Sequence, residues 1–392
     1  MKNKNVTLVV FTLMNFVLAM LSFVFNGILD QVAVSLNISI SDSGLLTTMY
    51  LYGAAFGVPI SLILFRKIER IRMLKIALLI TILMTFALVL TKDFTQLLII
   101  RLITGISSIS YSVLAISTVM AFSSKERQGR SMAFLIMGNS LALVIGIPLT
   151  RALSAILDWR SIFWILNVMM TLSLIYFQIY LTESSHASTK LDLGNELKFF
   201  KDGKTVFVII YTLIMFVGYG AFYTYVTPYL LYLFPSLETI MSILLVLLGI
   251  AGFTGNLIGG HVSDRIGYAR ALLLGAVMHV ISIVMIFLFQ SHQWLSVIST
   301  LLWLMSSWFI GLQLNTGIAQ VTQNKSSFMI SLNTSAIQLG SAIGSSLAAI
   351  VISQSGMQNI VFITLLTSLG ITITQIISNK KYLPTTLTEI NE

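Results

Sequence analysis

The sequence contains no cysteine, only four histidines, and charged side chains at just 9% of its 392 residues. Without cysteine, neither disulfides nor thiolate-based metal sites can form. The histidines and carboxylates are not grouped as a metal centre or an intramembrane hydrolase requires, and no G-x-x-x-x-G-K loop is present to cradle the phosphates of ATP. We therefore expect no metal, no cofactor and no enzymatic activity.

Hydrophobic residues make up 56% of the chain, which leaves too little polar surface to cover a water-soluble protein. They gather in apolar segments of about 20 residues, the length that crosses a bilayer core of roughly 30 Å. The first segment is too long for the apolar part of a signal peptide, and many similar segments follow it. The sequence predicts an all-α membrane protein with twelve transmembrane helices near residues 6–33, 43–65, 73–91, 96–119, 131–155, 161–181, 205–231, 236–260, 270–289, 294–318, 328–353 and 357–378.

A polar stretch at residues 182–204 divides these segments into two sets of six. Residues of the first half recur in the second at a constant offset, so that Gly57 matches Gly255 and Arg72 matches Arg270. Such weak internal symmetry is typical of transporters in which two bundles rock about a central site. We expect two pseudo-symmetric six-helix bundles at 1–181 and 205–379, a cytoplasmic linker at 182–204 and a cytoplasmic tail at 380–392.

The net charge of +9 is explained by membrane topology rather than by nucleic-acid binding, which would require the basic residues to share one face. Of the 23 Lys and Arg, all but four lie on the same side of the predicted membrane, the exceptions being Lys92, Arg101, Arg151 and Arg160. The positive-inside rule then places both termini in the cytoplasm.

The loop between the eighth and ninth segments carries the pattern G-x-x-x-D-R-x-G-x-x-R at Gly260, Asp264, Arg265, Gly267 and Arg270. Glycine permits tight turns, and the aspartate can complement a helix amino terminus or pair with an arginine. A positively flanked membrane loop would explain the charges alone, but the spacing resembles the loop signature of the major facilitator superfamily. The resemblance covers essentially the whole chain and implies that these residues form a conformational latch. In the first-half copy, Arg66 stands at the position of the acid, which puts a latch there in doubt.

Two residues are candidates for proton coupling. Arg101 lies in the fourth segment with Gly105 four residues on, and a guanidinium in an apolar segment must face a polar partner or snorkel to the surface. The pair resembles the superfamily's fourth-helix Arg-Gly motif, which is associated with proton transfer. Asp30 near the end of the first segment is the other candidate, although it would serve equally well as a solvated end residue; the glutamate common in the first helix of related exporters is replaced here by Ser22.

The fifth segment contains Gly138, Gly146 and Pro148, and the sequence Trp159-Arg160-x-x-Phe163 follows it. Glycine and proline are frequent in membrane helices, where they allow close packing and bending. The arrangement nevertheless resembles the antiporter motif of the drug and metabolite exporters within the superfamily.

An aromatic run from Phe222 to Tyr229 resembles the arabinose, purine and chloramphenicol efflux group of that branch. Its rings could stack on a flat or amphiphilic solute or merely pack between helices. The residues that we expect to line the solute cavity are Asn26, Tyr111, Phe222, Tyr223, Tyr225, Gln313, Asn315 and Asn333.

Together these features predict a secondary transporter of a bacterial plasma membrane, functional as a monomer surrounded by lipid. It would export a small organic solute, such as a drug, sugar, nucleobase or metabolite, in exchange for protons. The absence of an acid at Ser22 keeps open an importer or facilitator of the same fold that is not proton-coupled. A membrane sensor is a third possibility, for which no sequence feature argues.

Overall fold

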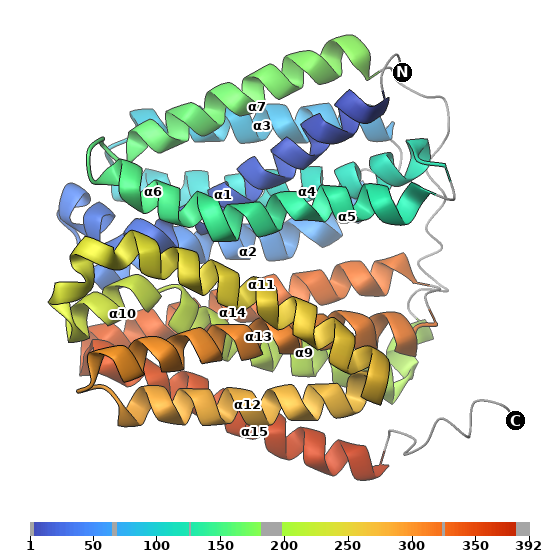
Figure 1. The fold of residues 1–392 in the computed structure, drawn as a ribbon. Helices are drawn as coiled ribbons and strands as arrows, with labels where there is room; N and C mark the ends of the chain where they lie inside the picture. The colour runs from blue at the N-terminus through green and yellow to red at the C-terminus, as the bar shows by residue number, and fades with distance from the viewer. Residues whose placement is uncertain (1–3, 65–68, 125–126, 182–197, 324–325, 382–392) are drawn as a thin grey trace, which may run out of the picture. The chain divides into compact units, whose positions relative to one another are not determined.

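The computed structural model describes residues 4–64, 69–124, 127–181, 198–323 and 326–381, and all regular elements in these ranges are helices (Figure 1). Most of the predicted linker and the predicted tail lie outside the described residues, as does Arg66. The division of the chain at 182–204 therefore stays a prediction.

The helices of the first half are α1 (Lys4–Leu36), α2 (Ile40–Leu64), α3 (Arg70–Leu90), α4 (Phe94–Phe122), α5 (Gln128–Leu141), α6 (Ile147–Ser154) and α7 (Arg160–Tyr180). Those of the second half are α9 (Gly203–Tyr223), α10 (Val226–Leu233), α11 (Met241–Ile266), α12 (Tyr268–Leu288), α13 (Gln293–Val321), α14 (Ser327–Ser355) and α15 (Ile360–Lys381).

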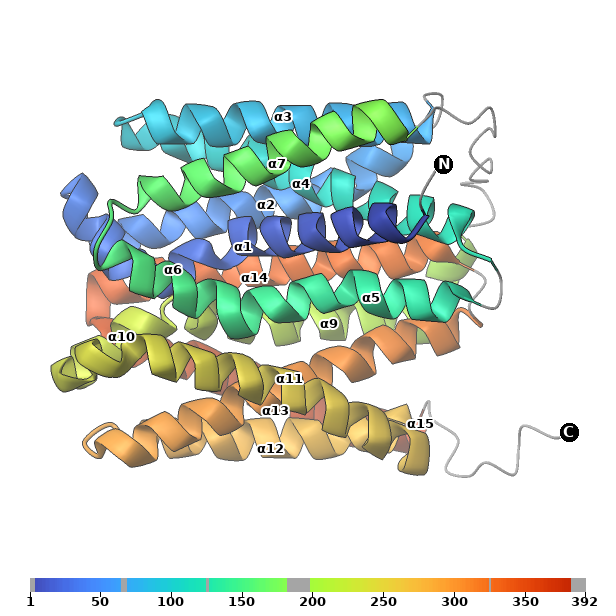
Figure 2. The ribbon, with the colours of Figure 1, turned by 45° about the horizontal axis from the view of Figure 1, so that its top comes forward.

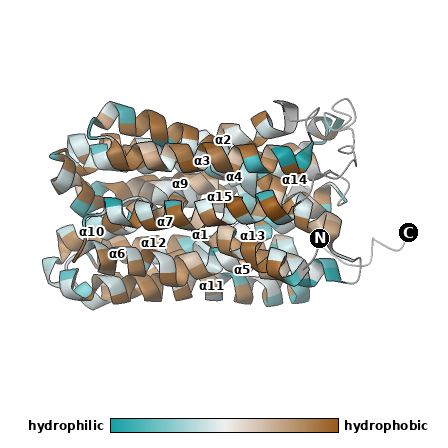
Figure 3. Cartoon of the chain, turned by 90° about the horizontal axis from the view of Figure 1, so that it is seen from above, coloured by the Kyte–Doolittle hydropathy of each residue, from teal (hydrophilic) through white to brown (hydrophobic). Residues whose placement is uncertain are grey.

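Eleven helical segments among the described residues are long and apolar enough to cross a membrane. Helix α2, with 25 residues, is a twelfth helix of comparable length. Since a helix rises about 1.5 Å per residue, even the 21-residue helices reach the roughly 30 Å of a bilayer core. Hydrophobic residues cover most of the length of the helices (Figure 3). The predicted twelve-helix membrane fold is confirmed.

The chain forms two compact units. The first consists of Met1–Leu191, Tyr223–Leu231 and Pro235–Gly249, and the second of Asp192–Phe222, Tyr232–Phe234 and Ile250–Glu392. The first unit thus includes two stretches of the second half of the sequence, one around α10 and one covering the start of α11.

In the first unit, α1 packs against α2, α5, α6 and α7, while α3 contacts both α4 and α7 (Figures 1 and 2). Its core contains interlocked aromatic rings, with Phe11 4.8 Å from Phe177 and Phe25 5.3 Å from Phe163 between ring centroids. Helices α2 and α4 approach so closely that a Cβ on Gly105 would collide with the carbonyl oxygen of Tyr50. Small residues at such contacts are the usual means by which membrane helices pack.

In the second unit, α12 packs against α13 and α15, and α14 contacts both α13 and α15. Helix α9 lies on α14 through Gly220, where a Cβ would collide with the carbonyl of Ser341. Gly267 separates α11 from α12 with a φ of 79°, a left-handed conformation that glycine adopts without strain.

Three helices are interrupted in the first unit or at its edge. Ile28 has non-helical φ and ψ angles of −133° and 18° within α1. A π-helical turn at Ala142–Gly146 separates α5 from α6, and Pro148 follows at the start of α6. The predicted single segment 205–231 is divided into α9 and α10 at Thr224 and Tyr225, and Pro228 lies in the first turn of α10, where its missing N–H is not needed.

Candidate functional site

Three charged side chains meet in the first compact unit. Arg151, in the last turn of α6, donates hydrogen bonds to Asp30 of α1 and to Glu238 in the 3₁₀ turn before α11. Both nitrogen–oxygen distances are 2.6 Å. The Arg151 side chain is only 3% exposed, whereas those of Asp30 and Glu238 are 22% and 55% exposed. We call this group the Arg151 cluster.

The helices that contribute Asp30 and Arg151 are both irregular just before these residues, α1 at Ile28 and α5–α6 at the π-helical turn Ala142–Gly146. The irregular residue Ile28 lies between Gly27 and Asp30, and the Gly27 carbonyl accepts a third hydrogen bond from Arg151 at 3.2 Å. Burying a guanidinium is costly unless its charge is paired and its donors are bonded. The Arg151 cluster meets both conditions, and both of its carboxylates are partly exposed to solvent.

Of these residues, the sequence predicts a role only for Asp30. Arg151 stands out merely as a basic residue on the unexpected side of the membrane, and Glu238 lies in a short polar stretch after Pro235. The rule that an arginine in an apolar segment needs a partner could have identified Arg151. No spacing rule connects it to Asp30 and Glu238, since the contacts span 121 and 87 residues.

Arg101 is completely buried and lies in a different environment. Its side chain donates to the backbone carbonyls of Leu21 and Leu46 at 2.9 and 3.0 Å. The guanidinium also lies over the rings of Phe25 and Tyr50, at 4.9 and 4.4 Å. No ion pair of Arg101 is found among the described residues, and its second terminal nitrogen has no hydrogen-bond partner there.

A narrow cleft lies in the first unit, with the predicted cavity residues Asn26 and Tyr223 in its wall. Its free volume of about 10 Å³ holds roughly one water molecule. Thr47 donates to the side-chain oxygen of Asn26 at 3.1 Å, and Thr227 donates to its backbone carbonyl at 2.7 Å. The other residues that line the cleft are Leu143, Ile147, Val226, Leu245, Leu248 and Gly249.

The remaining cavity candidates of the first unit are buried. Tyr225 donates to the carbonyl of Ser41 at 3.1 Å and fills the space beside Gly44. The hydroxyl of Tyr111 is buried without a hydrogen-bond partner among the described residues. Tyr225 therefore takes part in helix packing, whereas Tyr111 retains an unused polar group.

The candidates of the second unit form separate contacts. Phe222 packs edge-on against Trp303, with ring centroids 4.8 Å apart. The Gln313 amide donates to the carbonyl of Gly259 at 2.9 Å. Asn333 donates to the side-chain oxygen of Asn315 at 3.0 Å, so these two are brought together.

Four residues of the predicted latch, Asp264, Arg265, Gly267 and Arg270, are exposed at the junction of α11 and α12, and Gly260 is half-buried. Asp264 and Arg265 form no ion pair with any described residue. The left-handed backbone at Gly267, with its φ of 79°, explains why the pattern has a glycine there. At Gly260 a Cβ would fit, because it would lie in ordinary contact with Leu312 at 3.8 Å. The latch role, including that of Arg270, stays a prediction.

The glycines of the predicted antiporter motif bring α5 and α6 against α1. A Cβ on Gly138 would collide with the carbonyl of Thr12, and one on Gly146 would lie 2.8 Å from Met20. Beyond α6, Trp159 donates to Ser35 at 3.0 Å, and its ring packs on Phe25 with centroids 5.8 Å apart. The motif therefore holds the part of the chain that carries Arg151 against α1.

Comparisons with known proteins agree with this architecture. The profile of the Major Facilitator Superfamily matches residues 11–317. A probable sugar efflux transporter of Helicobacter pylori (strain P12) is 26% identical over 359 residues, and the MFS-type transporter YbcL of Bacillus subtilis (strain 168) is 24% identical over 357 residues; each alignment covers 90% of both chains.

Solved structures show the same fold. The xylose transporter XylE of E. coli has a TM-score of 0.73 at 14% identity, covering 98% of both chains. The nucleoside transporter NupG has a TM-score of 0.73 at 14% identity, covering 96% of this chain and 99% of its own. The resemblance found in the sequence motifs is confirmed: the chain belongs to the major facilitator superfamily, and it is a multi-pass membrane transporter of small solutes.

Proposed function

We propose that this transporter exports a small hydroxylated solute, such as a sugar, in exchange for protons that bind at Asp30. The Arg151 cluster carries the proposal. Proton coupling requires a titratable group whose charge controls a structural contact, and Asp30 is a partly exposed carboxylate bonded to a buried guanidinium. The name of the Helicobacter pylori relative, a probable sugar efflux transporter, supports the direction and the solute class.

Protonation of Asp30 would remove the charge that strengthens its hydrogen bond with Arg151. Arg151 would then keep only Glu238 and the Gly27 carbonyl as partners. Glu238 belongs to the Pro235–Gly249 stretch of the first unit, so weakening the cluster loosens that stretch from α1 and α6. We expect this loosening to favour a second conformation of the transporter.

The position of Asp30 suits a proton that arrives from outside the cell. With both termini in the cytoplasm, as the basic residues predict, the far end of α1 at Leu36 faces outward, and Asp30 lies less than two turns before it. Protons outside would therefore reach the cluster directly. Their inward movement would drive the solute outward.

The cleft offers a polar group and an aromatic face to a hydroxylated solute. Asn26 lies in its wall and is oriented by hydrogen bonds from Thr47 and Thr227, and Tyr223 adds an aromatic face. Because the cleft holds roughly one water molecule, a solute can enter only after the Pro235–Gly249 stretch moves. This dependence would link solute access to the state of Asp30.

Inverted membrane vesicles test the proposal. With an imposed proton gradient, vesicles containing the protein should accumulate a labelled sugar from a panel that also includes nucleosides and drugs. Asp30→Asn should lose this accumulation while retaining exchange of the same solute across the membrane. Asp158→Asn is the matched control, since Asp158 is 55% exposed and lies 4.0 Å from Arg160 in a loose ion pair, and it should retain both activities. Accumulation that survives Asp30→Asn would contradict the coupling role.

A facilitator or importer that is not proton-coupled is the alternative, and one observation favours it. The buried Arg101 has no acidic partner among the described residues, and Ser22 occupies the position where related exporters carry a glutamate. Uptake of the solute by whole cells, unchanged by collapsing the proton gradient, would establish this alternative.

A further inference from the structure

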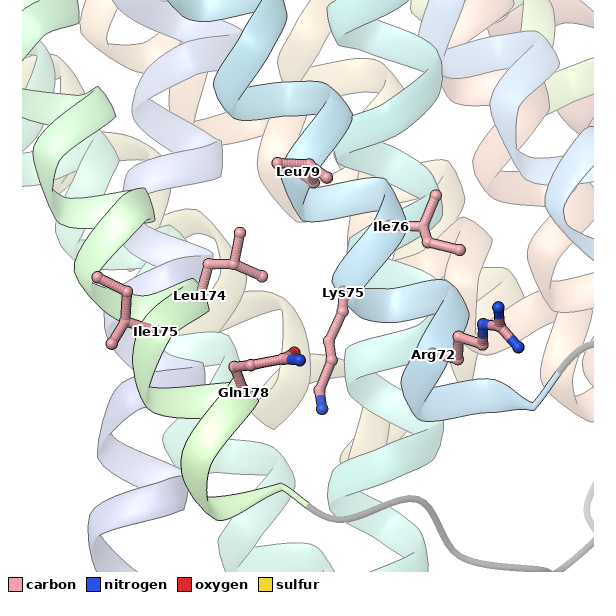
Figure 4. Close-up of a pocket in the computed structure, with 7 residues that line it drawn as sticks. All are labelled: Arg72, Lys75, Ile76, Leu79, Leu174, Ile175 and Gln178. Carbon is pink, nitrogen blue, oxygen red and sulfur yellow. The ribbon is translucent and has the colours of Figure 1, made fainter.

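A groove runs between α3 and α7 of the first compact unit, where α3 begins and α7 ends (Figure 4). Its volume is about 510 Å³, far larger than that of the cleft beside Asn26. The residues that line it are Arg72, Lys75, Ile76, Leu79, Leu174, Ile175 and Gln178.

The side chains of the groove are sorted by polarity along the helices. Arg72 and Lys75 lie in the first two turns of α3, and Gln178 lies in the last turn of α7. Figure 4 shows Lys75 and Gln178 pointing toward one another across the gap between the helices. The apolar residues lie further from these ends, and two of them, Leu79 and Ile175, are 45% and 51% exposed.

This order follows from helix geometry. Arg72, Lys75, Ile76 and Leu79 are three, four and seven residues apart, so they share one face of α3. Along that face the chain rises about 10 Å from Arg72 to Leu79. The groove is therefore amphiphilic, with a basic mouth and an apolar floor.

The two basic side chains have no acidic partner in the described part of the chain. All three ion pairs found there involve other residues. The nearest acid in sequence, Glu69, accepts a hydrogen bond from the backbone N–H of Arg72 rather than from its guanidinium. Within the described ranges, the mouth thus presents two positive charges without an ion pair, beside an amide donor.

We propose that this groove binds an anionic phospholipid, with the phosphate at Arg72, Lys75 and Gln178 and an acyl chain along Ile76, Leu79 and Ile175. A membrane helix exposes its outer face to lipid, and charge complementarity selects a negative headgroup over a zwitterionic one. The basic ends of the helices are predicted to face the cytoplasm, which makes the ligand a lipid of the cytoplasmic leaflet. The proposal is independent of which solute the transporter moves.

Native mass spectrometry of the full chain in detergent tests the site. Phosphatidylglycerol and phosphatidylcholine with identical acyl chains are titrated into the wild type and into the double variant Arg72→Gln, Lys75→Gln. The wild type should retain phosphatidylglycerol in preference to phosphatidylcholine. Each basic residue near an anionic lipid contributes roughly 1 kcal/mol to binding, and about 1.4 kcal/mol corresponds to a tenfold change in affinity. The affinity for phosphatidylglycerol should therefore fall about fivefold for each charge removed.

Two further variants separate a specific site from general attraction. Arg127→Gln with Arg130→Gln removes the same charge from exposed positions at the start of α5, and it should leave binding unchanged. Ile175→Trp fills the apolar floor without changing any charge, and it should weaken binding of phosphatidylglycerol. Thermal unfolding confirms that each variant is folded.

Four results would overturn the proposal: equal retention of both lipids, equal loss of phosphatidylglycerol in the Arg127 and Arg130 variant, unchanged binding in Ile175→Trp, or displacement of the lipid by inorganic phosphate. The last result would show that the basic mouth takes a soluble anion.

Discussion

Replacement of Asp30 by Asn imitates the protonated carboxyl and should release the Pro235–Gly249 stretch from α1 and α6. The asparagine keeps the size of the side chain and one oxygen acceptor, but it removes the negative charge that faces Arg151 at 2.6 Å. Arg151 remains charged, because a guanidinium does not lose its proton in this environment. The substitution therefore isolates the effect of charge on the Arg151 cluster.

The size of the effect follows from the burial of the three side chains. Removing one partner of a fully buried ion pair costs about 3–5 kcal/mol. Asp30 is 22% exposed and Glu238 stays bonded to Arg151, so we reduce this cost to about 2 kcal/mol, or roughly 30-fold in an equilibrium. Glu238 is 55% exposed, and Glu238→Gln should cost less than about 1 kcal/mol, or up to roughly fivefold.

A cysteine introduced at Leu245 reports the release. Leu245 is 5% exposed, lies in the Pro235–Gly249 stretch and lines the cleft beside Asn26. Since the chain has no native cysteine, a membrane-impermeant maleimide added from outside labels only this position. Its labelling rate is proportional to the population in which the stretch has moved away. Asp30→Asn should raise the rate about 30-fold and Glu238→Gln by no more than about fivefold.

Asp158→Asn serves as the control, because it removes an exposed carboxylate from a loose ion pair at 4.0 Å and should leave the labelling rate unchanged. If Asp30→Asn labels Leu245→Cys at the parent rate, the carboxylate does not hold the stretch in place. If Asp158→Asn accelerates labelling equally, the effect is one of general surface charge. Either result would exclude the ion pair of Asp30 with Arg151 as the contact that holds the Pro235–Gly249 stretch.

Three other substitutions, one of them with a matched control, test buried residues of the first unit. Gly105→Ala places a Cβ against the carbonyl of Tyr50 and should lower the free energy of unfolding by about 1–3 kcal/mol in detergent, whereas Gly129→Ala, which meets nothing within 4 Å, should cost less than about 0.5 kcal/mol. Arg101→Lys cannot reproduce the planar hydrogen bonds of the guanidinium, and it should abolish gradient-driven transport in vesicles while expression in the membrane is retained. Tyr225→Phe removes a buried hydroxyl that donates to a carbonyl, which should lower the free energy of unfolding by about 1 kcal/mol. An unchanged melting temperature would show that this hydrogen bond is not formed.

The fold could be predicted from the sequence because each apolar segment is long enough to span the bilayer and because lipid permits only helices or closed barrels. The predicted segment at 73–91 corresponds to α3 at Arg70–Leu90, for example. The break between α9 and α10 was not predicted, since the residues around it are as apolar as a continuous helix. Pro228 was the available signal, because a proline lacks the N–H and its ring clashes with the carbonyl four residues earlier, here that of Thr224, where the helix breaks.

The site could be predicted only in part. Asp30 was identified because it is the acid nearest to Ser22, where related exporters carry a glutamate, and Arg101 because an arginine within an apolar segment must find partners. That Arg151 binds Asp30 and Glu238 depends on how α1, α6 and the turn before α11 pack, and hydrophobic periodicity carries no information about such distant contacts. The small volume of the cleft likewise follows from packing that no local pattern records.

Simultaneous recording of solute and proton movement in proteoliposomes shows whether the protein exchanges one for the other. The vesicles contain the purified protein, an internal pH indicator and no initial pH gradient, and a transported sugar is added outside. We predict that sugar entering the vesicles drives protons out, so that the interior becomes alkaline, and that Asp30→Asn abolishes this pH change while exchange of sugar continues. Sugar entry that acidifies the interior, or that leaves its pH unchanged, would contradict exchange of solute for protons.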